Sequence, residues 1–207
     1  MNTLMKKKNE SSEQLNIQLF LLCMLAALLC RRLGKISSLR IICGMLRTMI
    51  YVGVYIGWGI SIYKRVIQKS VRNVLIFIAE LIIFWFVVRT TKYFFTMDNQ
   101  IARYLWYSYY IPMLFIPVAV LQAAFFLGKS EEYRLPKWLK GVYIPTAVLV
   151  LLVLSNDLHQ LVFSFPVRSA RSDSHYTYGW GYYVVLVWEV VCALTAFVLM
   201  IYKCRHS

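Results

Sequence analysis

The apolar residues of this chain lie in six blocks, each close to or above the length of about 20 residues that a membrane-spanning helix needs. The blocks lack the alternation of apolar and polar residues that a membrane β-barrel requires. We therefore predict an all-α fold, a polytopic helical membrane bundle with about five to six transmembrane helices. The blocks are Leu15–Cys30, Ile41–Tyr63, Val74–Val88 with a helical flank to Phe95, Ile101–Leu127, Leu139–Leu154 and Tyr182–Tyr202.

The composition supports a membrane protein and excludes other classes. Hydrophobic residues make up 60% of the 207 residues, and charged residues only 15%. A disordered chain would be poorer in apolar residues, and a soluble globule of this length could not bury so many. The 23 Lys and Arg against 9 Asp and Glu give a net charge of +14. Because these basic residues fall at or between the blocks, they indicate anchors that flank a lipid bilayer, and we predict no nucleic-acid partner.

The distribution of basic residues predicts the orientation. From residue 64 onward, the connections 64–72 and 128–140 and the C-terminus hold ten Lys and Arg, whereas the connections 89–103 and 155–181 hold five. Cytoplasmic loops carry the excess of Lys and Arg. We therefore expect a multi-pass protein of the cell (cytoplasmic) membrane with a cytoplasmic C-terminus and with residues 89–103 and 155–181 outside.

The first block does not fit this orientation well. If Leu15–Cys30 spans the membrane, the basic run Arg31–Arg40 lies outside, and the total bias becomes only 13 inside against 10 outside. A 16-residue block is also short for a span. Two alternatives remain open: this block lies at the membrane interface, or translation begins at an internal methionine, Met45 or Met49.

The sequence carries no recognisable catalytic or metal-binding motif. It has no G-x-S-x-G nucleophile elbow, no H-E-x-x-H zinc helix and no phosphate-binding loop. The five cysteines lie in or beside apolar blocks without Cys-x-x-Cys spacing, which indicates neither a disulfide framework nor a metal site. We therefore expect no enzyme activity in this chain, no cofactor and no metal.

Two acidic residues lie inside apolar blocks, Glu80 and Glu189. A carboxylate within a membrane span is a candidate functional group by default, because it is costly there. Each of the two either binds a cation, relays a proton or latches two helices, or it is a packing residue that faces the bundle. Both readings stay open, since polar contacts between helices are common packing devices.

The segment SNDLHQ, residues 155–160, is the most unusual polar group. It directly follows an apolar block on the predicted outer side. On a continuing helix, Asn156 and Gln160 share a face by their four-residue spacing, whereas Asp157 and His159 project elsewhere. Asp157 and His159 are candidates for a pH-sensitive pair, because histidine titrates in the physiological range. The alternative is a polar helix end at the interface; we keep all four residues as ligand or switch candidates.

Aromatic residues crowd the same predicted side of the membrane. They form either the aromatic belt of a membrane interface or the lining of a ligand pocket between helix ends. Three prolines further along the blocks predict kinks. The aromatic residues are Tyr104, Trp106, Tyr107, Tyr109, Tyr110, Tyr176, Tyr178, Trp180, Tyr182 and Tyr183, and the prolines are Pro112, Pro117 and Pro145.

Three segments follow one another along residues 45–204. TTKYFF (90–95) ends one predicted helix, and ARYLWYSYY (102–110) opens the next with tyrosines. After a short basic loop and a further helix, SNDLHQLVF (155–163) carries an Asn-x-x-His motif. In this order the segments resemble the N-terminal seven-transmembrane sensor region of bacterial sensor histidine kinases and related bacterial membrane proteins.

The resemblance implies an external N-terminus for the sensor region and a link to a cytoplasmic signalling domain or partner protein. The sequence departs from the family pattern at both ends, with about 40 additional N-terminal residues and no segment after the fifth family helix. We therefore divide the chain into a basic tail with a short apolar segment, residues 1–40, and a partial seven-transmembrane-type sensor domain, residues 41–207. We expect a fragment, a truncated reading frame or a stand-alone remnant.

The leading hypothesis is a membrane-embedded sensor module of a bacterial signalling protein, which relays an outside or intramembrane stimulus through helix packing. A small-molecule ligand on the outer side and a homodimer are further partners that we consider. The first alternative is a small transporter or channel subunit, in which Glu80 and Glu189 would line a path. The second is a structural subunit of a membrane complex.

Overall fold

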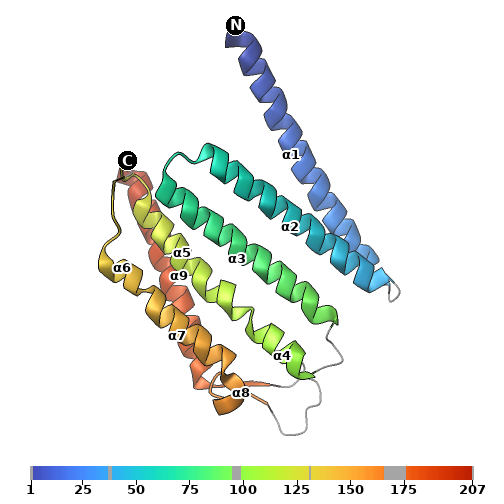
Figure 1. Ribbon diagram of the computed structural model, residues 1–207, viewed down its shortest axis with the longest axis vertical. Helices are drawn as coiled ribbons and strands as arrows, with labels where there is room; N and C mark the ends of the chain where they lie inside the picture. Colours follow the sequence, from blue (N-terminus) through green and yellow to red (C-terminus); the bar gives the residue numbers. More distant parts are fainter. Residues whose placement is uncertain (1, 37–38, 95–98, 131, 166–175, 207) are drawn as a thin grey trace. The chain divides into compact units, whose positions relative to one another are not determined.

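The computed structural model describes residues 2–36, 39–94, 99–130, 132–165 and 176–206. The chain divides into two compact units, Met1–Gly57 and Trp58–Ser207. The first unit contains α1 (Asn2–Leu33) and most of α2 (Arg40–Arg65) (Figure 1). At the end of α1, the amide of Gly34 donates to the carbonyl of Cys30 at 2.9 Å. A Cβ at Gly34 would lie 3.0 Å from that oxygen, so this turn favours glycine.

The second unit contains the remaining elements and the candidate site. Its two short strands pair antiparallel, with Phe163 opposite Tyr178 and Ser164 opposite Thr177. Besides the last part of α2, its elements are α3 (Lys69–Phe94), α4 (Asn99–Tyr107), α5 (Tyr110–Phe126), α6 (Lys137–Gly141), α7 (Tyr143–Leu154), α8 (Asn156–His159), β1 (Phe163–Ser164), β2 (Thr177–Tyr178) and α9 (Trp180–His206).

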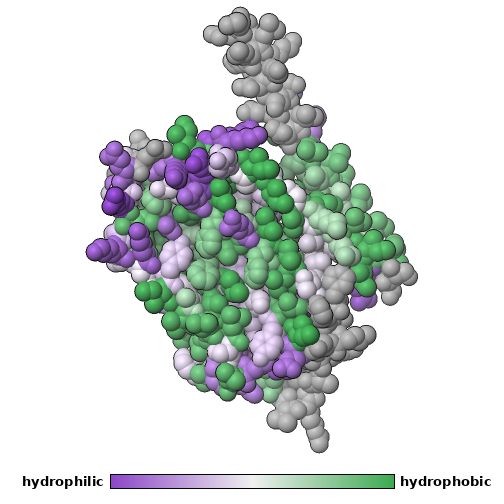
Figure 2. All heavy atoms as spheres, in the orientation of Figure 1, coloured by the Kyte–Doolittle hydropathy of each residue, from purple (hydrophilic) through white to green (hydrophobic). Residues whose placement is uncertain are grey.

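Five helical stretches among the described residues are long and apolar enough to cross a membrane, by length and composition. The predicted helical membrane bundle is therefore confirmed. α1, which contains the block Leu15–Cys30, is not one of these stretches. In the space-filling view, hydrophobic side chains cover the middle of the helices (Figure 2). The five stretches are Arg40–Arg65, Lys69–Lys92, Gln100–Phe126, Lys137–Leu154 and Trp180–Arg205.

Helix α5 is the centre of the second unit, because it packs against α3, α7 and α9 (Figure 1). Small side chains allow this close approach. Ala119 and Ala124 on α5 are fully buried, and Ala196 on α9 is 2% exposed. Lipid tails are as apolar as leucine, so helices in a membrane associate through such close packing rather than through the hydrophobic effect.

Two prolines explain why two of the apolar blocks are each built from two helices. Pro112 has no N–H for the carbonyl of Ser108, and its ring crowds that carbonyl. The chain turns at residues 108–109, between α4 and α5, and the Ser108 carbonyl instead accepts from the amide of Ile111 at 3.3 Å. Pro145 likewise lies four residues after Gly141, where α6 ends before α7. Helix α5 continues through Pro117.

The Lys203 end of the second unit comprises the α2–α3 and α5–α6 connections and the C-terminal end of α9. Here the ammonium group of Lys203 donates to the carbonyls of Phe125 at 2.8 Å and Leu127 at 2.7 Å. The side-chain amide of Gln68 donates to the carbonyl of Lys129 at 3.2 Å. The last carbonyls of a helix lack partners within it, so these side chains satisfy the end of α5. Hydrophilic side chains gather at this end (Figure 2).

Enlarging Ala119 tests the packing of α5. Ala119→Leu inserts three carbons into a fully buried position, and we expect it to lower the free energy of unfolding by about 2 kcal/mol. Denaturant unfolding in detergent micelles measures this change. Met113→Leu, at a position that is 40% exposed on the same helix, is the control and should leave stability nearly unchanged. Equal stability of both variants would contradict the close packing of α5.

Candidate functional site

The side chain of Asn156 lies at the centre of the Asn156 end, which comprises α8, the β1–β2 pair and the first turn of α9. This side chain is fully buried. Its Oδ1 accepts from the amides of Val162 at 3.0 Å and Phe163 at 2.9 Å. Its Nδ2 donates to the carbonyl of Phe163 at 2.8 Å and to the hydroxyl of Tyr107 at 3.1 Å. One amide thus uses its full hydrogen-bonding capacity to join α8, β1 and α4.

The chain reverses direction directly after α8. Gln160 adopts a left-handed conformation, with φ 50° and ψ 30°, and its amide donates to the carbonyl of Asn156 at 2.7 Å. The helix therefore does not continue through Gln160, and Asn156 and Gln160 do not share a helix face. Gln160 is exposed, and its Oε1 accepts from the hydroxyl of Ser164 at 3.4 Å. The reversal brings residues 162 and 163 back onto the Asn156 side chain.

Asp157 points to α4 rather than to the histidine two residues later. Its Oδ1 accepts from the hydroxyl of Tyr107 at 2.7 Å and from the guanidinium of Arg103 at 3.3 Å. The side chains of Arg103 and Asp157 are 24% and 20% exposed, so solvent reaches this ion pair. The guanidinium of Arg103 also lies 4.4 Å from the ring centre of Phe165, within the range of a cation–π interaction.

His159 binds backbone groups on both sides of the reversal. Its Nδ1 accepts from the amide of Leu161 at 3.0 Å, and its Nε2 lies 3.1 Å from the carbonyl of Leu152. The hydroxyl of Ser155 lies 3.3 Å from Nε2. These contacts assign the proton to Nε2, since Nδ1 acts as an acceptor.

Phe163 is the centre of an aromatic cluster that joins aromatic residues of the segments 104–110 and 176–183. The ring of Phe163 lies 4.6 Å from that of Trp106, between ring centres, and 5.7 Å from that of Tyr110. It also lies 5.6 Å from Tyr176 and 5.9 Å from Tyr182. Tyr107 and Tyr110 are buried, which differs from an interface belt, whereas Tyr104, Tyr178, Trp180 and Tyr183 are exposed as a belt requires.

The start of α9 is held against the reversal by backbone contacts. The amide of Gly179 donates to the carbonyl of Val162 at 2.9 Å, and the amide of Gly181 donates to that of Leu161 at 3.0 Å. A Cβ at Gly179 would lie 2.0 Å from the Leu161 oxygen, so only glycine permits this approach. Asn156 binds the amide of Val162, and the carbonyl of Val162 binds Gly179. The Asn156 side chain is therefore linked to the start of α9 through the backbone of Val162.

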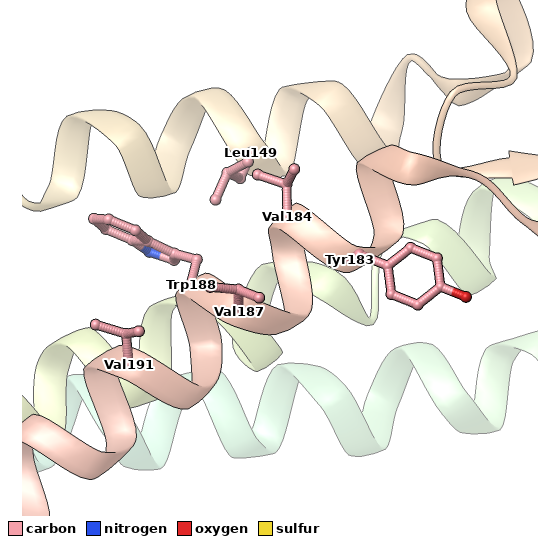
Figure 3. Close-up of a pocket in the computed structure, with 6 residues that line it drawn as sticks. All are labelled: Leu149, Tyr183, Val184, Val187, Trp188 and Val191. Atoms are coloured by element: carbon pink, nitrogen blue, oxygen red, sulfur yellow. The ribbon is translucent and has the colours of Figure 1, made fainter.

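An open apolar groove of about 380 Å³ lies between α7 and α9 (Figure 3). Trp188 forms one side of it, and its indole Nε1 donates to the hydroxyl of Thr146 on α7 at 3.1 Å. The surface that lines the groove is almost entirely apolar. Its lining residues are Leu149, Tyr183, Val184, Val187, Trp188 and Val191, and only Tyr183 belongs to the aromatic residues that the sequence singled out.

The two intramembrane carboxyls lie on different helices. Glu80 is exposed on α3, and Glu189 is half-buried on α9. Among the residues that the structure describes, no hydrogen bond or ion pair reaches either carboxyl. The structure therefore does not bring the two carboxyls together with each other or with the Asn156 network. This network comprises the side chains of Asn156, Asp157, Arg103 and Tyr107 and the backbone of Val162 and Phe163. Within the same described residues, no group of three His, Cys, Asp or Glu side chains could hold a metal ion.

The sequence did not single out the side chains of Arg103, Phe163 and Phe165 as site residues. Arg103 counts as one more membrane anchor in the sequence, and Phe163 as one more apolar residue. Phe163 could have been found from the sequence, because it lies only seven positions after Asn156 and closely follows the polar segment 155–160. No such signal exists for Arg103, which is 54 residues away from Asp157.

These features define a multi-pass helical membrane protein in which a buried polar network joins the helix ends. The model of the family described as the N-terminal 7TM region of histidine kinase matches residues 41–207. The chain therefore belongs to this family, and the resemblance noted in the sequence is confirmed. The match places residues 41–207 in a membrane region and not in a kinase catalytic domain. Searches of curated proteins and of solved structures gave no match.

Removing the Asn156 amide tests the network. Asn156→Ala leaves the buried amides of Val162 and Phe163 without their acceptor, and we expect the free energy of unfolding to fall by about 3 kcal/mol. Thermal unfolding in detergent micelles measures this loss. Leu158→Ala changes a side chain on the same short helix that is 89% exposed and serves as the control. A loss no larger than that of the control would show that the network does not hold this end together.

Proposed function

We propose that this chain is the membrane-embedded sensor module of a bacterial signalling protein. The family match carries the proposal, because the family consists of regions that precede histidine kinases. In this function, a stimulus at the outer surface or within the membrane changes how the helices pack. A cytoplasmic signalling domain or partner protein reads the change. The ligand candidates of the sequence, Asn156, Asp157, His159 and Gln160, all belong to one end of the second unit.

The distribution of charge supports an orientation with the Asn156 end outside and the Lys203 end in the cytoplasm. From residue 64 onward, the connections and helix ends that meet at the Lys203 end carry ten Lys and Arg and the other connections five, and cytoplasmic segments carry such an excess. With five spans, residue 40 and the C-terminus lie on opposite sides of the membrane. The basic residues of the Lys203 end are Lys64, Arg65, Lys69, Arg72, Lys129, Arg134, Lys137, Lys140, Lys203 and Arg205.

Helix α9 is the element best placed to relay a change between the two ends. It begins at the glycine contacts with the reversal, and its last turn holds Lys203, which binds the end of α5. Its 27 residues correspond to a length of about 40 Å. A shift of its first turn would therefore reach the carbonyls of Phe125 and Leu127. Such a switch requires that the stimulus favour one of two helix arrangements.

The Arg103–Asp157 ion pair is the part of the network that an outer stimulus would reach first, because it is partly exposed. Behind it, the hydroxyl of Tyr107 binds both Asp157 and the buried Asn156. A ligand that competes for Arg103 or Asp157 would thus change the surroundings of Asn156 through a single hydroxyl group. We infer that an outer small-molecule ligand carries a charged group.

The alternative functions have less support. A transporter or channel subunit would need Glu80 and Glu189 along one path, but Glu80 lies on an exposed face of α3. A structural subunit would need no communication between the two ends. The distance measurement below therefore separates a sensor from a structural subunit.

A distance measurement across the Lys203 end tests the sensor function. One spin label is attached to Cys204, which is exposed, and a second to Lys69→Cys, with the other cysteines replaced by alanine. Asp157→Asn removes the charge facing Arg103, and we expect the distance between the labels to change by about 2 Å or more in lipid nanodiscs. Pulsed electron paramagnetic resonance measures it.

Leu158→Ala is again the matched control, because it lies next to Asp157 and contacts solvent. The control should leave the distance unchanged. An unchanged distance in Asp157→Asn and also in Asn156→Ala, with both variants folded, would argue against communication between the ends and so against the sensor function.

A further inference from the structure

Three basic residues from three parts of the second unit meet at the Lys203 end. The ammonium group of Lys203 on α9 binds the last carbonyls of α5, and Lys129 lies three residues after α5 ends. The side-chain amide of Gln68 donates to the carbonyl of Lys129. Arg72 lies one turn after Gln68 on the same side of the helix, since its amide donates to the Gln68 carbonyl at 3.0 Å. We call Arg72, Lys129 and Lys203 the basic cluster.

The basic cluster lies at the level of the membrane edge. Each of its three residues is within three positions of the end of a candidate span, since these spans begin at Lys69 and end at Phe126 and Arg205. The guanidinium of Arg72 lies 5.0 Å from the ring centre of Tyr63, which is 64% exposed, and tyrosine is enriched at membrane interfaces. The headgroups of a bilayer occupy this level, directly outside the hydrocarbon core.

The described part of the chain supplies no anion to the basic cluster. No ion pair from these residues reaches any of its three members, and the charges of Lys129 and Lys203 lie close enough to repel each other. The Nε of Arg72 is buried without a hydrogen-bond partner in the described structure. The α5 carbonyls use two of the three donors of Lys203. The cluster therefore combines uncompensated positive charge with N–H donors, and an anion would satisfy both.

We propose that the basic cluster binds the phosphate group of an anionic phospholipid. Basic pockets between the ends of membrane helices bind acidic lipid headgroups, and the level of the cluster in the membrane matches that of the phosphates. A zwitterionic lipid brings a positive amine together with its phosphate, so three uncompensated charges favour a lipid with net negative charge. The bound headgroup would connect α3, the end of α5 and α9. This inference does not depend on the sensor function.

Native mass spectrometry of the full chain in detergent micelles, titrated with phosphatidylglycerol or with phosphatidylcholine, tests the site. The parent chain should bind phosphatidylglycerol more tightly than phosphatidylcholine. Arg72→Gln and Lys129→Gln should each weaken the binding of phosphatidylglycerol about fivefold, because each removes one charge that faces the headgroup. The side chain of Lys129 is exposed, and Gln68 binds only its backbone carbonyl, so Lys129→Gln keeps the fold. Lys203 stays unchanged, because it also holds the end of α5.

Lys140→Gln is the matched control. Lys140 is exposed on α6 at the same end of the second unit, and its replacement removes the same charge without touching the basic cluster. This variant should bind phosphatidylglycerol as tightly as the parent chain. An equal loss of binding in Lys140→Gln and Lys129→Gln would show a general effect of surface charge and overturn the proposal. Equal binding of the two lipids to the parent chain would overturn it as well.

Thermal unfolding in the same micelles separates a lipid from a free anion. A ligand that binds only the folded chain raises its unfolding temperature, so phosphatidylglycerol should raise it in the parent chain and less in Lys129→Gln. Millimolar inorganic phosphate should leave it unchanged, because a free anion lacks the acyl chains that hold a headgroup at the membrane edge. A rise with inorganic phosphate as large as that with phosphatidylglycerol would assign the cluster to a soluble anion and overturn the proposal.

Discussion

The hydrogen bonds of the Asn156 side chain are the interaction on which the Asn156 end depends. A chain that leaves a membrane helix must find partners for its backbone groups before it reaches water, because an unpaired buried group is costly. Asn156 supplies two acceptor and two donor positions, and all are used by Val162, Phe163 and Tyr107. No apolar residue could close the reversal in this way, and serine or threonine would provide too few positions.

The remaining parts of this end follow from that reversal. The ring of Phe163, which the Asn156 hydrogen bonds position, contacts aromatic rings from α4, from the segment before β2 and from α9. Gly179 and Gly181 then approach the carbonyls of Val162 and Leu161 closely enough to fix the start of α9. His159 holds the same turn from its other side through Leu152 and Leu161. The polar segment 155–160 is therefore both a helix end and a structural connection between helices.

Much of the fold could be predicted from the sequence because the bilayer fixes the length of a span and because two of the three prolines in the spans mark where a helix breaks. The spans at Val74–Val88 and Tyr182–Tyr202 lie within helical stretches of the structure, and Ile101–Leu127 matches the stretch Gln100–Phe126 to within one residue at each end. The breaks precede Pro112 and Pro145. The contacts of the site could not be predicted in the same way. Asp157 binds Arg103, which lies 54 residues earlier in the chain, and a left-handed residue, Gln160, ends the helix; hydrophobic periodicity reports neither feature.

The protein thus combines a tightly packed centre with polar connections at both ends. Small residues let α5 contact three neighbours, while Lys203 and Asn156 satisfy backbone groups at opposite ends of the second unit. Helix α9 takes part in both polar connections. Its exposed apolar surface, including Val187 and Leu194, fits a helix that lies against lipid. A helix held at its two ends and free along one side suits a relay between the two sides of a membrane.

Hydrogen–deuterium exchange of the full chain in lipid nanodiscs tests the central claim most directly, because it reports on the amides that Asn156 is said to organise. In Asn156→Ala, compared with the parent chain, exchange should rise together at residues 161–164 and at residues 177–182, while the core of α5 around Ala119 stays protected. Such joint opening would show that one side chain couples the reversal to the start of α9. Faster exchange at 161–164 alone, with residues 177–182 unchanged, would contradict the account.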